Sequence, residues 1–232
     1  MDIKLIAYTP NPDRVCASAA FTSWKKLSTK ELFEELSDKE AFDFLRMVLG
    51  FGHVSVAEHA TFTFSIKGIS RAASHQLVRH RIASYTQQSQ RYIKFKKDEV
   101  ECVIPKSIEK SRFGKEFREM VKKIAEFYER MSKEIPVEDS RYILPNATKT
   151  NIVVTMNARE LLHFFGLRLC NRSQWEIREL AQRMLDEVKK VAPVLFENAG
   201  PRCKELGYCP EGKLSCGKMP TKEEVLRGVL RK

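Results

Sequence analysis

Residues 79–91 read RHRIASYTQQSQR, and the fold and function expected of this chain both depend on them. The stretch opens with Arg79, His80 and Arg81, closes with Arg91, and carries hydroxyl and amide side chains between them. A guanidinium is a planar fork of N–H donors that matches a phosphate, whereas uncharged donors and acceptors match the edges of a heteroaromatic ring. The mixture favours a nucleotide pocket. A solvated basic loop is the alternative for a bare RHR triplet, because short basic motifs match by chance.

Strand and helix signals lie immediately upstream of this stretch. ATFTFSIKG at 60–68 alternates apolar with polar side chains, which is typical of a half-buried strand. Ser70 is a cap-type residue for a helix predicted over residues 70–81. Gln76 and Arg79 stand three residues apart, so this helix would place them on one face near its C-terminal end.

The rest of the chain shows the same alternation of strand-like and helix-like hydrophobic patterns, and it contains no sequence repeats, low-complexity tracts or flexible linkers. The patterns predict strands at Ile3–Tyr8 and 150–156, two helices within Thr29–Leu49 that break near Ser37, a long helix from Phe113 that ends before Pro136, a helix over 157–169 opened by Asn157, a further helix behind a Ser173–Glu176 capping box, and a short polar helix within 221–232. The predicted fold class is α/β, with a mixed sheet flanked by helices.

Length and composition describe an ordinary globular protein. The chain has 232 residues, enough for one substantial domain, with 43% hydrophobic and 31% charged residues. No apolar run approaches the ~20 residues of a membrane-spanning helix, and MDIKLIAYTP does not resemble a secretory signal, so we expect no membrane partner and a cytoplasmic location. The net charge of +11 attracts anions but does not distinguish DNA, RNA, nucleotides and folates.

The cysteines do not form a recognisable ligand pattern. Six of them are scattered over the chain, which argues against a secreted disulfide scaffold and favours free thiols. Cys203, Cys209 and Cys216 near the C-terminus are separated by five and six residues rather than by a CxxC spacing, so we expect no metal site. We expect one domain over residues 1–200, with a cysteine-containing tail over 201–232 packed on it.

Beyond the triplet itself, the spacing of several motifs carries a family resemblance. Arg79-His80-Arg81, then seven residues, Ser89 and Arg91-Tyr92 resemble the signature of the flavin-dependent thymidylate synthases. Further motifs follow the family order: GHVSVAEHATFTF with His53, Ser55, Glu58 and His59, then Arg141 in RYILP, the triplet Asn157-Ala158-Arg159, and Arg168 in GLRLCNRSQWEI. The resemblance covers about residues 40–200.

This resemblance implies an FAD-dependent methyltransferase of dTMP biosynthesis. Its reaction is the reductive methylation of dUMP to dTMP, with 5,10-methylenetetrahydrofolate as the carbon donor, reduced FAD as the hydride donor and NADPH as the reductant of the flavin. The resemblance also implies a homotetramer whose active sites combine residues from several subunits. A nucleotide phosphate, a pyrophosphate and a folate tail would together call for many arginines.

By the same resemblance, Arg168 would be the catalytic residue, set against the uracil to favour its ionised form. The residues expected to bind dUMP are Gln76, Arg79, Gln87, Ser89, Gln90, Arg91, Arg141 and Arg168. Those expected to bind FAD are His53, Ser55, Arg79, His80, Arg81, Gln87, Asn157, Arg159 and His163. The chain departs from the common family pattern at Thr86, Gln87, Gln90, His163 and Arg172. At Gln87 the departure removes an acidic contact.

Two other readings of the basic stretch remain open. A nucleic-acid-binding module could use the arginines along a phosphate backbone, but no RNP, KH, zinc-finger or helix-turn-helix pattern accompanies them. A related flavoprotein with another acceptor would differ only in pocket detail. Within the synthase reading, no cysteine lies in the matched nucleotide motifs, and Ser89 has no obvious activating base. We therefore expect Ser89 to contact the ligand rather than to act as a nucleophile.

Overall fold

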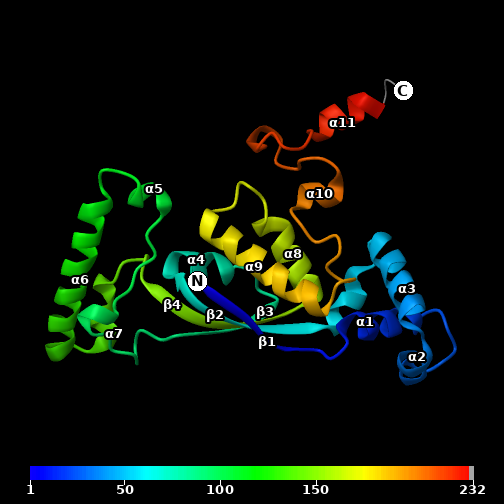
Figure 1. Cartoon of the computed structure of the whole chain (residues 1–232), viewed down its shortest axis with the longest axis horizontal. Coiled ribbons are helices and arrows are strands. Elements are labelled where there is room, and N and C mark those ends of the chain that lie inside the picture. The colour runs from blue at the N-terminus through cyan, green and yellow to red at the C-terminus, as the bar shows by residue number, and fades with distance from the viewer. Residues whose placement is uncertain (230–232) are drawn as a thin grey trace. The chain divides into compact units, whose positions relative to one another are not determined.

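The computed structural model describes residues 1–229, and its strands form one four-stranded sheet in the order β1-β2-β4-β3 (Figure 1). The strands are β1 Asp2–Tyr8, β2 Thr61–Ser70, β3 Ala83–Gln87 and β4 Lys149–Asn157. The helices are α1 Pro12–Phe21, α2 Thr29–Glu35, α3 Asp38–Gly50, α4 Arg71–Leu77, α5 Lys106–Glu109, α6 Gly114–Glu134, α7 Val137–Ser140, α8 Ala158–Arg168, α9 Trp175–Val191, α10 Arg202–Leu206 and α11 Lys222–Val229. Short 3-10 turns are η1 Val54–His59, η2 Lys97–Glu99, η3 Arg141–Ile143 and η4 Gly212–Leu214. The α/β fold class is confirmed.

The chain divides into two compact units. Unit 1 comprises residues 1–2, 65–79 and 85–153, and unit 2 comprises residues 3–64, 80–84 and 154–232. The last three residues of the predicted C-terminal helix, 230–232, lie outside the described part of the chain.

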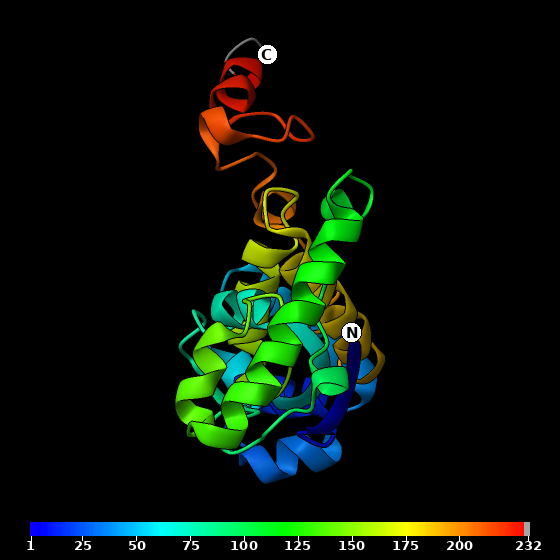
Figure 2. The same ribbon diagram turned by 90° about the vertical axis from the view of Figure 1, so that its left-hand side faces the viewer.

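Unit 1 is built around the long helix α6, which runs straight over its whole length in Figure 2. Its buried face includes Ala125 and the fully buried Tyr128, which pack with Val100 and the ring of Phe95. At its start, a Cβ atom on Gly114 would lie 2.7 Å from the Glu109 carbonyl oxygen. Only glycine therefore permits this close approach of α6 to the end of α5.

Unit 2 has an aromatic core between β2, α8 and the segment that follows α9. The Phe196 ring meets the Phe62 and Phe165 rings edge-on, with centroids 5.4 and 5.9 Å apart. Asp13 on α1 is buried, and its carboxylate accepts hydrogen bonds from the backbone N–H groups of Val194 and Leu195 at 3.0 and 2.9 Å. Burial raises the pKa of Asp13, and the two backbone hydrogen bonds offset this effect only in part. The carboxylate thus fixes the segment after α9 to the N-terminal helix.

Three local predictions were wrong in detail. The helix that follows Ser70 ends at Leu77, so Arg79 lies beyond it and does not share a helical face with Gln76. Tyr85 Oη donates to the Leu77 carbonyl at 2.9 Å, which satisfies a carbonyl at the helix end. Downstream, the N-cap of α9 is Gln174, whose side chain accepts from the first-turn N–H groups. Ser173 instead donates to the Leu167 carbonyl.

Candidate active site

A group of arginines gathers in unit 1 around the turn that joins α7 to η3. Arg141 Nε donates to the Glu138 carbonyl at 3.0 Å, and Arg91 donates to the Glu138 carboxylate through Nε at 3.1 Å and Nη2 at 2.9 Å. Glu138 therefore holds both side chains from one short helix. Arg71, the first residue of α4, is half-buried near them.

The positive charges of Arg71 and Arg141 repel each other. Burial lowers the pKa of Arg71, and the positive charge of Arg141 lowers it further. Two partly desolvated guanidinium groups that repel each other are stabilised when a dianion binds between or beside them. Arg71 was missed from the sequence because it lies outside the recognised motif. Its position directly after the capping Ser70 was the one available signal.

Polar side chains of the signature are fixed beside this group. Ser89 Oγ accepts the Arg91 N–H at 3.1 Å, and the Ser89 carbonyl accepts the Ile93 N–H at 3.1 Å, which closes a turn. Gln87 Nε2 donates to Ser74 Oγ at 3.0 Å and to Thr150 Oγ1 at 3.2 Å. The Gln87 amide nitrogen is thus committed to the protein, so its carbonyl oxygen is the end suited to a ligand.

The remaining nucleotide candidates of unit 1 differ in exposure. Gln76 on α4 and Gln90 after β3 are half-buried, whereas Arg79 is exposed beyond the end of α4. All three come from the segments that flank the arginine group in sequence. Unit 1 therefore contains every residue expected to bind dUMP except Arg168.

Unit 2 holds a buried polar chain that ends at Arg168. Arg168 Nε donates to His80 Nε2 at 3.0 Å, and His80 Nδ1 lies 3.3 Å from Glu160 Oε1. His80 and Glu160 are 4% and 6% exposed, and the imidazole also stands edge-on to the Phe164 ring. Burial lowers the pKa of His80 to about 4, and the charges of Arg168 and His163 act in the same direction. The imidazole is therefore neutral at pH 7.

The expected flavin residues lie around the start of α8 and along η1. Asn157 Oδ1 accepts the Glu160 N–H at 2.9 Å, which confirms Asn157 as the cap of α8. Arg159 pairs with Glu58 of η1, next to the exposed Ser55. Exposed cations and a helix N-terminus suit the negative charge of a dinucleotide pyrophosphate.

The other flavin candidates of unit 2 are more varied. His53, Arg81 and His163 are exposed, and the His163 ring centroid lies 5.8 Å from that of His80. The donor set of this unit is thus compatible with FAD. His80 is the exception among the expected flavin residues, because its imidazole contacts Arg168 and Glu160 inside the protein.

Comparisons with known proteins agree with one another. The family model described as thymidylate synthase complementing protein matches residues 4–194. A flavin-dependent thymidylate synthase of Geobacter sulfurreducens is 49% identical over 229 residues, which cover 98% of both chains. That of Pyrococcus horikoshii is 54% identical over 221 residues, which cover 91% of this chain and 90% of the relative. This chain belongs to the flavin-dependent thymidylate synthase family.

A solved structure of the family shares the fold. The crystal structure of flavin-dependent thymidylate synthase ThyX from Helicobacter pylori, complexed with FAD and dUMP, matches with a TM-score of 0.71. The match has 26% sequence identity and covers 86% of this chain and 100% of that chain. The family resemblance first carried by residues 79–91 is therefore confirmed.

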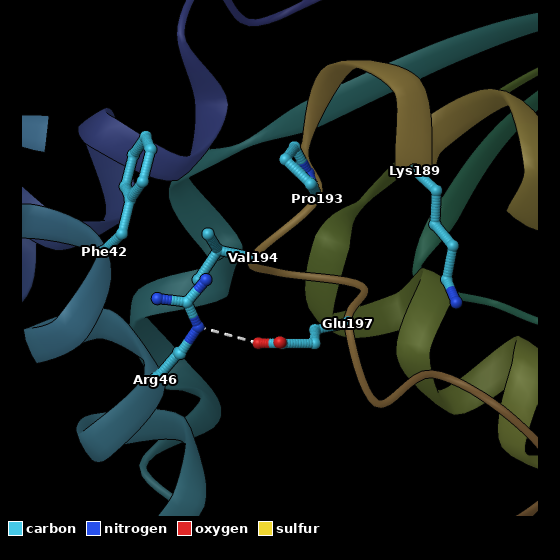
Figure 3. A pocket seen from close by; sticks show the side chains of 6 residues that line it. All are labelled: Phe42, Arg46, Lys189, Pro193, Val194 and Glu197. Atoms are coloured by element: carbon cyan, nitrogen blue, oxygen red, sulfur yellow. Dashed lines mark hydrogen bonds and ion pairs between the residues drawn. The ribbon is translucent and has the colours of Figure 1, made fainter. Parts of the chain in front are cut away.

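Within the described residues of this family member, other possible sites are weaker. No group of three or more His, Cys, Asp or Glu side chains could hold a metal ion there, and the six cysteines are free thiols. No described helix has the length and apolar character to cross a bilayer. A surface depression of about 430 Å³ lies in unit 2. Figure 3 shows the side chains that line it, among them Arg46, which pairs with Glu197. Its lining is Phe42, Arg46, Lys189, Pro193, Val194 and Glu197, all different from the expected site residues.

The neutral state of His80 predicts a pH dependence of stability. Because the pKa of His80 falls from 6.5 to about 4 on folding, the unfolded chain binds this proton more tightly. The contribution of His80 is therefore fully present above pH 6.5 and is lost as the pH falls toward 4. The free energy of unfolding should fall by up to about 1.4 kcal/mol per pH unit in this window.

Urea unfolding of the parent protein and of a His80→Gln variant, measured between pH 4 and 7, checks this expectation. The variant lacks the titrating imidazole but keeps the Glu160 carboxyl group. Its stability should vary less steeply with pH than that of the parent. Parallel curves for the two proteins would contradict a buried neutral His80.

Proposed function

We propose that this chain binds dUMP and converts it to dTMP with FAD as its cofactor. The observation that carries the proposal is the family match along nearly the whole chain, together with a ThyX structure that holds both FAD and dUMP on the same fold. We further propose 5,10-methylenetetrahydrofolate as the carbon donor and NADPH as the reductant. The cytoplasm, where these small molecules occur, is the proposed location.

The substrate phosphate is assigned to the arginine group of unit 1. Arg91 and Arg141 are oriented by Glu138, and Arg71 adds a third charge beside Arg141. Arg79 is exposed, and its long side chain would add a further contact to the phosphate. Gln76, Ser89 and Gln90 would contact the sugar or the base. For Gln87, the carbonyl oxygen would face the nucleotide, because its amide nitrogen is bound to Ser74 and Thr150.

Arg168 is assigned the catalytic role. A guanidinium beside the uracil stabilises negative charge on the ring, which favours the ionised base and makes carbon 5 more nucleophilic. The FAD, when bound, supplies the hydride that completes the methyl group. His53, Ser55, Arg81, Asn157, Arg159 and His163 would hold it, with the cations near its pyrophosphate. No protein nucleophile is needed in this scheme, so Ser89 keeps its place as a ligand contact.

We also propose a homotetramer with shared active sites, in which residues 1–200 carry the chemistry and the tail over 201–232 packs on the same domain. An exposed apolar stripe on α6 supports this proposal. The stripe consists of the N-cap Phe113, Met120 and Phe127, which follow one another at seven-residue spacing and are 51%, 51% and 43% exposed. Such a stripe is typical of a helix face that packs against another helix. Contact between α10 and α8 supports the packing of the tail.

The purified protein should be yellow and should form dTMP only when dUMP is supplied. We would record the visible absorbance of bound FAD and then measure dTMP by chromatography after adding NADPH, methylenetetrahydrofolate and dUMP. Omission of dUMP or of the folate, one at a time, is the control. A colourless protein, or a yellow one that makes no dTMP under these conditions, would contradict the proposal.

A further inference from the structure

We infer that His80 and Glu160 are positioning residues that fix the guanidinium of Arg168. The inference rests on the proposed catalytic role of Arg168, and it goes beyond it by giving His80 and Glu160 a task in the reaction. All three residues belong to unit 2, and the contacts that join them are the Arg168 to His80 bond of 3.0 Å and the His80 to Glu160 approach of 3.3 Å.

The direction of these contacts is set by the chemistry of the groups. An arginine Nε can only donate, so His80 Nε2 must be the acceptor and must carry no proton. In a neutral imidazole the proton then sits on Nδ1, which is the atom that faces the Glu160 carboxylate. The negative charge of the Glu160 carboxylate, 3.3 Å from Nδ1, therefore favours the tautomer that can accept from Arg168.

Glu160 and Arg168 can be connected only through His80. Glu160 and Arg168 stand eight residues apart on α8, so their backbones are separated by about 12 Å along the helix axis. Neither an i,i+4 pair nor a direct ion pair can form over that length. Each end suits its place on α8, because a carboxylate is stabilised at a helix N-terminus and a cation at a helix C-terminus.

The surroundings hold the bridge in one orientation. The imidazole is 4% exposed and its ring lies edge-on to Phe164, with centroids 4.9 Å apart. The backbone of Glu160 is fixed in turn by the cap bond from its N–H to Asn157. With Nε held by a fixed imidazole, the plane of the Arg168 guanidinium is fixed before substrate binds.

A pair of substitutions at His80 separates positioning from packing. His80→Gln places a carbonyl oxygen near the position of Nε2 and can still accept from Arg168, whereas His80→Phe keeps a ring of similar volume but has no acceptor. If His80 only filled space, the phenylalanine variant would be the more active of the two. Positioning predicts the reverse order, with His80→Phe at least about 10-fold slower than the parent in kcat and His80→Gln keeping most of the rate.

The measurement is single-turnover dTMP formation by the holoenzyme with its flavin reduced beforehand, together with FAD content and the KM for dUMP. We expect FAD content and KM to stay close to those of the parent while kcat changes. Adding His80→Phe to an Arg168→Lys enzyme should cause little further loss, since both changes remove the same contact. Equal rates for His80→Phe and His80→Gln would overturn the inference, and so would an equal loss in both.

Glu160→Gln tests the contact between Glu160 and His80. It also provides a second test if His80→Phe fails to fold. Arg168 Nε still requires an unprotonated Nε2, so the amide oxygen would face Nδ1. Without a negative charge it holds the Nδ1–H tautomer less strongly, and kcat should fall several-fold. Glu187→Gln is the control, because it makes the same change on α9, where the Glu187 carboxylate pairs with Lys190. Parent-level kcat in Glu160→Gln would remove Glu160 from the inference.

A failure of the inference and a failure of the proposed function give different results. A parent enzyme that forms no dTMP contradicts the proposed function before any variant is compared. A parent enzyme that turns over and loses rate on Arg168→Lys, but not on His80→Phe, retains the proposed function and overturns positioning by His80.

Discussion

Arg168→Lys is expected to slow dTMP formation on the order of 10²-fold or more while FAD and dUMP remain bound. Lysine keeps the positive charge but presents a single ammonium in place of a planar fork. The ammonium can reach either the uracil or His80, whereas the guanidinium donates to His80 through Nε and carries further N–H groups at its other nitrogens. Loss of charge stabilisation on the ring should therefore appear in the chemical step.

The rate should be measured in a single turnover on enzyme whose flavin is already reduced, so that an effect on flavin reduction is excluded. Arg183→Lys is a matched control, because this exposed arginine pairs with Glu179 on α9 and has no place in the proposed site. A parent-like rate in Arg168→Lys would show that Arg168 is a replaceable contact.

Arg141→Gln is expected to weaken dUMP binding by roughly 10- to 100-fold, which corresponds to the ~1.5–3 kcal/mol of a charge-assisted hydrogen bond. The same change should not lower the stability of the protein without dUMP, because it relieves the repulsion between Arg141 and Arg71. A loss of affinity without a loss of stability is the signature of a side chain kept for its ligand.

Two measurements check this expectation together: the Kd for dUMP by titration calorimetry, and the thermal midpoint with and without dUMP. The rise in Tm caused by dUMP should shrink in Arg141→Gln. Arg130→Gln removes the same charge from an exposed part of α6 and controls for general attraction of anions. If both variants lost the same affinity, the net charge of +11 rather than a built phosphate site would explain the binding.

Residues with a strong period or a clear cap could be predicted from the sequence. The alternation of Phe62, Phe64 and Ile66 gave β2, and Asn157 gave the start of α8, because both signals are local. Strand β3 was missed, since ASYTQ is polar and its half-buried positions depend on a neighbouring strand. Helix α1 was missed as well, because its buried residues include small and polar side chains such as Ala17, Ser18 and Asp13.

The candidate site divides in the same way. The sequence order of the motifs was enough to assign the family, which the comparisons confirm. It could not place the His80 side chain against Arg168, because the two residues are 88 positions apart and only the folded chain brings them together. Arg71 could not be recognised either, since its importance comes from the charge of Arg141, which lies 70 positions further along the chain.

The buried Asp13 carboxylate has a consequence for the order in which the chain can fold during synthesis. Its two hydrogen-bond partners lie 181 and 182 residues downstream, so α1 leaves the ribosome long before either of them exists. Until then a carboxylate that belongs in the interior must stay hydrated, and the apolar side of α1 stays uncovered. Most of unit 1 is translated during that interval. Helix α1 is thus made early and secured late, and a chain truncated before Val194 would lack the two N–H groups that bind Asp13.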